Sequence, residues 1–230
     1  MSIKTITKLS TEEVNINFEE MMELINKYIP EPRLGKIMKL INEMLENIVT
    51  APASSFKKFH ASFSGGFIHH TLNVMKNAIK VDKLYTDSGF GKRLYTMEEL
   101  IFSALCHDLY KIGFLPKDGG SKYTPNTNVW KQKNYGQMYE FSSKGLNSLP
   151  PEEATMFLLS KYDIKCSKNE VIGIKCANGK FSKHWDDFFP DYSPMLAQET
   201  NLHIVIHQAD FMSSIIENRK FYWNNLEENQ

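Results

Sequence analysis

The 230-residue chain has few cysteines, no net charge and no long apolar run, and each of these absences excludes a class of protein. Its three cysteines are odd in number and form no Cys-x-x-Cys pair, which argues against a disulfide framework or a zinc ribbon and suits a reducing compartment. Lysine plus arginine and aspartate plus glutamate both total 27, so no global field draws the chain to nucleic acid or anionic lipid. No stretch reaches the roughly 18 apolar residues of a membrane span, and the first residues lack the apolar core of a signal peptide. We therefore expect a cytoplasmic protein with no membrane partner.

Helical periodicity dominates what is present. Apolar residues recur at three- and four-residue spacing in the segments 18–29, 33–49, 67–85, 97–110, 151–162, 168–176 and 195–223. This pattern predicts an all-α fold, a bundle of roughly six or seven helices.

Residues 113–149 interrupt the helical pattern with frequent glycine, proline and asparagine. Within them the runs NVWKQK and QMYEF flank Asn134 and Gly136, a pattern that predicts a small β-hairpin insertion. We divide the chain into an N-terminal helical extension (1–45), a main domain (46–225) and a frayed tail (226–230).

The dipeptide His107-Asp108 is the sequence motif that says most about function. It ends an apolar helix just before Gly113. Adjacent residues on a helix point about 100° apart, but at a helix end they can converge on one divalent cation. Lys111 lies on the same helix face and can hold a phosphate as a point charge. Further ligands are available upstream in GGFIHHT and downstream in HQADFMSS, and a mixture of imidazole and carboxylate suits Mn, Fe, Co, Ni or Zn.

These three segments resemble the HD-domain superfamily of metal-dependent phosphohydrolases, in particular its bacterial and phage members, whose pattern is H…HD…D. Their opening PA…H…GG…HT appears here as APASSFKKFHASFSGGFIHHT, HDxxK(I/V)G as HDLYKIG, and ADxxAS as ADFMSS. The resemblance covers about residues 50–220 and implies that 46–225 is an HD-domain helical bundle. It implies one divalent metal ion (Mn, Fe, Co, Ni, Zn or Mg), held by His70 rather than His69 together with His107, Asp108 and Asp210.

The resemblance also implies a function: hydrolysis of a phosphoester in a nucleotide or at a nucleic-acid end. Asp108 would orient the attacking water and accept its proton, and Lys111 would neutralise the phosphate. His60, in the opening segment, would touch substrate. Lys122 and Tyr123 would close over a base or sugar. The expected partner is a nucleotide or another phosphoester, single-stranded nucleic acid stays possible, and the sequence does not set the oligomeric state.

Two alternatives remain open. Some relatives carry two further histidines where this chain has Pro151 and Ala177, which favours a single-metal site and also allows a catalytically silent HD domain that binds a nucleotide or a protein partner. The second alternative is a 3′-end single-strand nuclease, which would need a basic, aromatic groove.

Two further histidines could also act as metal ligands. His203 and His207 are four residues apart on the helix that carries Asp210, a spacing that can chelate zinc from one helix face. We expect His207 to be structural.

Overall fold

The computed structural model describes residues 8–89, 92–183 and 200–220. Its longer helices are α1 (Thr11–Tyr28), α2 (Arg33–Glu43), α3 (Leu45–Thr50), α4 (Gly66–Asp87), α5 (Met97–Cys106), α6 (Val129–Tyr135), α7 (Pro151–Lys161), α8 (Lys168–Lys175) and α10 (Leu202–Asn218). Short 3₁₀ turns are η1 (Leu109–Ile112), η2 (Pro116–Asp118), η3 (Gly145–Ser148) and η4 (Gly179–Phe181). Strands β1 (Tyr123–Pro125) and β2 (Tyr139–Phe141) pair antiparallel, with Tyr123 opposite Phe141. The predicted helical fold with one small hairpin is confirmed.

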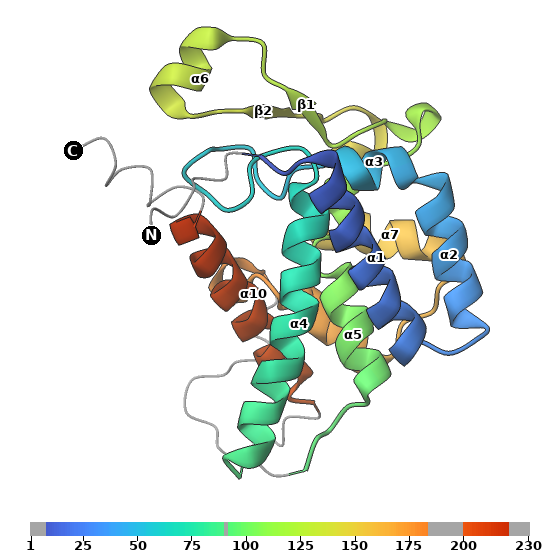
Figure 1. The fold of residues 1–230 in the computed structure, drawn as a ribbon. Helices are drawn as coiled ribbons and strands as arrows, with labels where there is room; N and C mark the ends of the chain where they lie inside the picture. The colour runs from blue at the N-terminus through green and yellow to red at the C-terminus, as the bar shows by residue number, and fades with distance from the viewer. Residues whose placement is uncertain (1–7, 90–91, 184–199, 221–230) are drawn as a thin grey trace.

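Helix α4 runs through the middle of the bundle (Figure 1). It packs against α1, α3, α5 and α10, and α8 packs in turn against both α5 and α10. One cluster of buried apolar side chains extends from Met21 on α1 to Ala209 on α10. Helices α1 and α2 therefore share the core of the rest of the bundle, while the division at residue 45 stays a prediction.

Local capping sets several helix starts. Ser10 accepts a hydrogen bond from the backbone N–H of Glu13, whose carboxylate accepts one from the Ser10 backbone in return. This capping box starts α1 at Thr11, whereas the apolar pattern predicted a start at residue 18. Equivalent boxes, with Thr96 and Ser167 as the N-cap residues, precede α5 and α8.

The predicted hairpin strands were partly wrong. β2 lies within the run QMYEF, but NVWKQK forms α6, and the partner strand is Tyr123–Pro125. Asn128 caps the start of α6 by accepting from the N–H of Lys131, and Gly136 ends the helix with a positive φ of 63°. The asparagine and glycine that suggested a hairpin turn thus belong to a short helix and its caps.

Other helix limits also differ from the prediction. The segment 33–49 divides at Met44 into α2 and α3, and the segment 97–110 stops being α-helical after Cys106. The last helix begins at Leu202, and residues 195–199, like the predicted tail at 226–230, lie outside the described residues. Among the described helices, none combines the length and the hydropathy that a bilayer-spanning segment requires.

Gly66 marks a close approach between the start of α4 and the preceding loop. A Cβ placed on Gly66 would lie 2.1 Å from the carbonyl oxygen of Ala61, which accepts a hydrogen bond from the Ala53 N–H. Alanine would therefore displace the loop that carries His60. We expect Gly66→Ala to lower the free energy of unfolding by about 3 kcal/mol, the upper end of overpacking effects, as measured by urea denaturation.

Gly35→Ala is the matched control. A Cβ on Gly35 meets the flexible side chain of Glu31 at 3.2 Å, and the position lies in regular helix. Because alanine is favoured over glycine in helices by up to about 1 kcal/mol, this variant should be neutral or slightly stabilised. Equal stabilities for the two variants would show that Gly66 makes no such close approach.

Candidate metal centre

Three parts of the fold meet at one buried cluster. His70 comes from α4, His107 and Asp108 from the junction of α5 and η1, and Asp210 from α10. At the junction His107 keeps helical backbone angles, whereas Asp108 has φ −118° and ψ 16°. This break lets two adjacent side chains converge, with His107 Nε2 3.4 Å from Asp108 Oδ2.

The cluster's donor atoms have the spacing of ligands to a single ion. His70 Nε2 lies 3.4 Å from His107 Nε2, 3.1 Å from Asp210 Oδ1 and 3.6 Å from Asp108 Oδ2. His107 Nε2 lies 3.9 Å from Asp210 Oδ1. Ligands bound at about 2.0–2.2 Å from one metal lie roughly 3.0–3.5 Å from each other. His70, His107 and Asp210 therefore form a group with metal-ligand spacing, and Asp108, which approaches both histidines, could join it after small adjustments.

The hydrogen bonds of the two histidines favour the same conclusion. His107 Nδ1 lies 2.7 Å from the Ala104 carbonyl oxygen, which can only accept, so Nδ1 carries the proton. His70 Nδ1 lies 3.0 Å from Glu217 Oε2. When each Nδ1–H donates in this way, loss of the remaining ring proton would leave an Nε2 lone pair of each histidine directed toward the carboxylates of Asp108 and Asp210. A metal ion could take the place of the proton that His70 Nε2 shares with Asp210 Oδ1, and a carboxylate or carbonyl behind each imidazole is typical of metal sites.

The electrostatics of the cluster also favour positive charge at its centre. Burial opposes protonation of His70, but Glu217 and Asp210 outweigh burial and raise its pKa to about 10. Burial likewise opposes ionisation of Asp108, yet Lys111 and His107 hold the pKa of that carboxyl well below its usual range. The carboxylates thus stay ionised and favour a positive charge beside them, which protonated His70 supplies here and a bound metal ion could supply instead.

His60 joins the cluster from the loop before α4. Its ring lies over that of His70, with centroids 4.3 Å apart, and its Nε2 is buried with no hydrogen-bond partner among the described residues. Burial and the neighbouring His70 lower the pKa of His60 to about 3, so the ring is neutral. His60, His70 and Asp108 offer a second group of donor atoms within 4.8 Å of one another. Substrate contact was predicted for His60, and its donor atom also lies among those that could hold a metal ion.

Lys111 contacts Asp108 directly. Its Nζ lies 2.5 Å from Asp108 Oδ2, and the lysine is only 7% exposed. The expected phosphate-neutralising amine is therefore beside the cluster, paired with one of the candidate ligands.

The two remaining predicted substrate residues lie in the hairpin region. Lys122 donates to the Asn147 carbonyl oxygen at 2.6 Å. Tyr123 packs against the rings of Tyr139 and Phe141, and burial raises the pKa of Tyr123 to about 12. These contacts make both residues part of the packed hairpin, and their expected role toward substrate stays a prediction.

Glu217 is a member of the cluster that the sequence analysis missed. It is 1% exposed, and its two oxygens engage His70 Nδ1 and, at 2.7 Å, the side-chain amide of Asn73. It lies two helical turns beyond Asp210 on α10, and this spacing is the signal that could have found it.

We expect Glu217→Gln to weaken metal binding about 10- to 100-fold, because His70 loses the anion that orients its ring and raises its basicity. Competition with a metal-binding dye would measure the change. Glu20→Gln is the control, because Glu20 pairs with Lys76 at the surface of α1 and α4. Unchanged affinity in Glu217→Gln would remove this residue from the metal centre.

The rival histidine pair takes no part in the cluster. His207 Nδ1 lies 2.9 Å from the Ala177 carbonyl oxygen, and His203 is buried in the core. Within residues 8–89, 92–183 and 200–220, the groups with metal-ligand spacing are those above, and neither contains His203 or His207. Pro151 opens α7 and Ala177 is fully buried, so neither position supplies a ligand.

The helical scaffold thus presents a buried histidine and aspartate cluster that could hold a metal ion. The function of this centre has to be argued from its own geometry. Comparison of the chain with protein-family models, with curated proteins and with solved structures finds no significant match in any of them.

Proposed function

We propose that the protein is a metal-dependent phosphohydrolase that acts on a phosphoester of a nucleotide or of a nucleic-acid end. The observation that carries the proposal is that His70, His107 and Asp210 have metal-ligand spacing and that Asp108 approaches both histidines, which are each oriented through Nδ1. A buried lysine beside this ligand set is the feature that distinguishes a phosphate-directed centre from a purely structural one. The resemblance of the same segments to the HD pattern supports this reading.

In this proposal the four residues hold the cation, with His60 in reach of it. The cation supplies Lewis acidity, which polarises the phosphoester and makes water a better nucleophile at neutral pH. Hydrolysis forms a bond from the water oxygen to phosphorus and breaks the ester P–O bond. Asp108, kept ionised by Lys111, accepts the proton of the attacking water, and that proton passes to the leaving oxygen. Lys111 balances the charge of the phosphate.

Metal analysis of the purified protein, followed by assays of phosphate release, tests the proposal. The substrates are a panel of nucleotides, and each is assayed with Mn, Co, Ni or Mg. We expect bound metal and turnover that stops when a chelator removes the metal. Absence of both metal and turnover with every cation would overturn the proposal.

A second candidate is the catalytically silent domain, which Pro151 and Ala177 favour because neither can replace a histidine. It predicts saturable nucleotide binding without turnover in the same panel. Nucleotide binding measured by calorimetry alongside phosphate release separates the two functions.

A further inference from the structure

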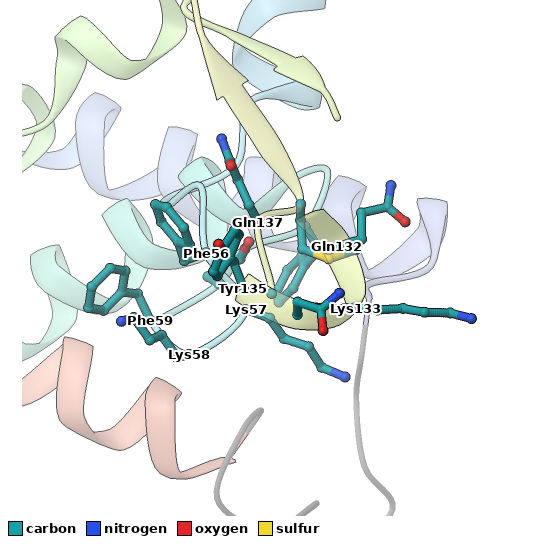
Figure 2. A pocket seen from close by; sticks show the side chains of 14 residues that line it. Phe56, Lys57, Lys58, Phe59, Gln132, Lys133, Tyr135 and Gln137 are labelled. Carbon is teal, nitrogen blue, oxygen red and sulfur yellow. The ribbon is translucent and has the colours of Figure 1, made fainter. Parts of the chain in front are cut away.

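A groove of about 950 Å³ lies between the loop before α4 and the segment around α6 (Figure 2). We call it the α6 groove. Its side chains with rings, amines or amides are Phe56, Lys57, Lys58, Phe59, Phe63, Gln132, Lys133, Asn134, Tyr135 and Gln137. The two walls are joined by backbone contacts, since Phe56 bridges to Gln137 and the N–H of Lys57 donates to the Gly136 carbonyl at 2.7 Å.

The α6 groove combines exposed aromatic faces with amines. Phe59 is 49% exposed and Tyr135 is 57% exposed, and the Nζ of Lys58 lies 5.3 Å from the centre of the Phe59 ring. Trp130 packs edge-on against Tyr135 at 5.1 Å and supports that ring. Among the described residues that line the groove, three are lysines and none is acidic. Stacking surfaces beside cations fit unpaired bases and the phosphates that join them.

A second, smaller pocket has lining residues in common with both the α6 groove and the candidate metal centre. It has a volume of about 470 Å³ and shares Phe59 with the groove, and His60, Ser214 and Arg219 also line it. His60 belongs to the metal cluster, and Ser214 Oγ lies 3.3 Å from Asp210 Oδ1. Phe59 thus lies between the groove and the side of the second pocket where His60 and Ser214 adjoin the cluster.

We propose, on the basis of the function proposed above, that the substrate is the end of a single-stranded nucleic acid. The terminal phosphoester lies at the metal centre, and the adjoining nucleotides cross Phe59 and bind in the α6 groove. A mononucleotide held at the cluster would leave Tyr135 and Lys57 without a ligand. Paired bases could not offer their faces to Phe59 and Tyr135, which selects a single strand over a duplex.

The first test measures binding by fluorescence anisotropy of a labelled short oligothymidylate with a chelator present. The double variant Lys57→Glu/Lys58→Glu should bind at least tenfold more weakly. The slope of log affinity against log salt should shrink by about 1.4, or roughly 0.7 for each lost phosphate contact. The control is Lys27→Glu/Lys39→Glu, which makes the same charge change at exposed lysines of α1 and α2 and should preserve binding.

A stacking test separates nucleic acid from a protein partner. Phe59→Leu keeps an apolar side chain but removes the aromatic face, so it should weaken oligothymidylate binding about tenfold. Polyglutamate, which carries charge without bases, should compete poorly for the groove. Competition by polyglutamate equal to that by oligothymidylate, with no effect of Phe59→Leu, would overturn the proposal in favour of an acidic protein partner.

The second test follows strands labelled at either end, with each cation in turn, and expects shortening from one end. Oligothymidylate that binds no tighter than a mononucleotide would overturn the inference, while turnover of mononucleotides would leave the proposed function standing. If strands bind in the α6 groove but no phosphoester is hydrolysed under any condition, the proposed function would be overturned. The proposed position of the strand's terminal phosphoester at the metal centre would be overturned with it.

Discussion

Asp108→Asn is expected to lower kcat for phosphoester hydrolysis by at least about 1000-fold. The amide keeps the shape of the side chain but cannot accept the proton of the attacking water, and general-base catalysis alone is worth about 10²–10⁴. It is also a poorer ligand, since the carboxylate oxygen that faces His70 and His107 loses its charge. Steady-state assays of the variant with saturating metal measure the loss.

The same substitution should destabilise the metal-free protein. Lys111 is 7% exposed and its Nζ pairs with Asp108, so the variant leaves a buried ammonium without its anion. Removing one partner of a buried pair costs about 3–5 kcal/mol in the free energy of unfolding. Adding Lys111→Met should recover most of this stability in urea denaturation with a chelator, while activity stays lost.

Asp163→Asn provides the control. Asp163 pairs with Lys36 at the surface, its side chain is 75% exposed, and its positive φ of 53° suits asparagine. Activity and stability should both stay near those of the unaltered protein. A kcat for Asp108→Asn within tenfold of the unaltered protein would exclude Asp108 as the base.

The helical scaffold could be predicted because its signals are local. Apolar spacing indicated the helices that now surround α4, and His107-Asp108 at a helix end indicated a convergence that the backbone angles of Asp108 provide. The segment around α6 was harder, since Asn134 and Gly136, which suggested a hairpin turn, fit the end of a short helix and its cap equally well. The ambiguity is resolved by the pairing of β1, which precedes α6, with β2, which follows it, with Tyr123 opposite Phe141.

The complete cluster could not be predicted, because several members are defined by packing between helices. Glu217 gains its role only when α10 lies against α4 and brings its carboxylate to His70. His60 lies in an irregular loop whose path depends on the close approach at Gly66. The α6 groove likewise forms only where that loop meets the segment around α6. Its lysines are scattered in the sequence, and the fold places them beside aromatic rings.

Glu170→Ala is expected to produce the largest loss of stability outside the metal centre. Glu170 is 0% exposed, and its two oxygens accept from Arg33 at 2.6 and 2.7 Å. The Arg33 guanidinium lies 3.5 Å from the centre of the Phe102 ring, so it has few waters to replace a lost carboxylate. Glu170 also closes the capping box of α8 by accepting from the Ser167 N–H at 2.7 Å.

Alanine removes both interactions, so we expect the free energy of unfolding to fall by about 3–5 kcal/mol in urea denaturation. Glu98→Ala is the matched control: Glu98 accepts from the same guanidinium at 3.1 Å but is 33% exposed, and its loss should cost about 1 kcal/mol or less.

Replacing both Arg33 and Glu170 with methionine should recover much of the loss, because no charge is then left buried and unpaired. Equal losses for the Glu98 and Glu170 variants would show that burial does not decide the strength of this pair. The expected difference would show that Arg33, on α2, is anchored to α8. That helix packs against α5, which leads into His107 and Asp108, and against α10, which carries Asp210.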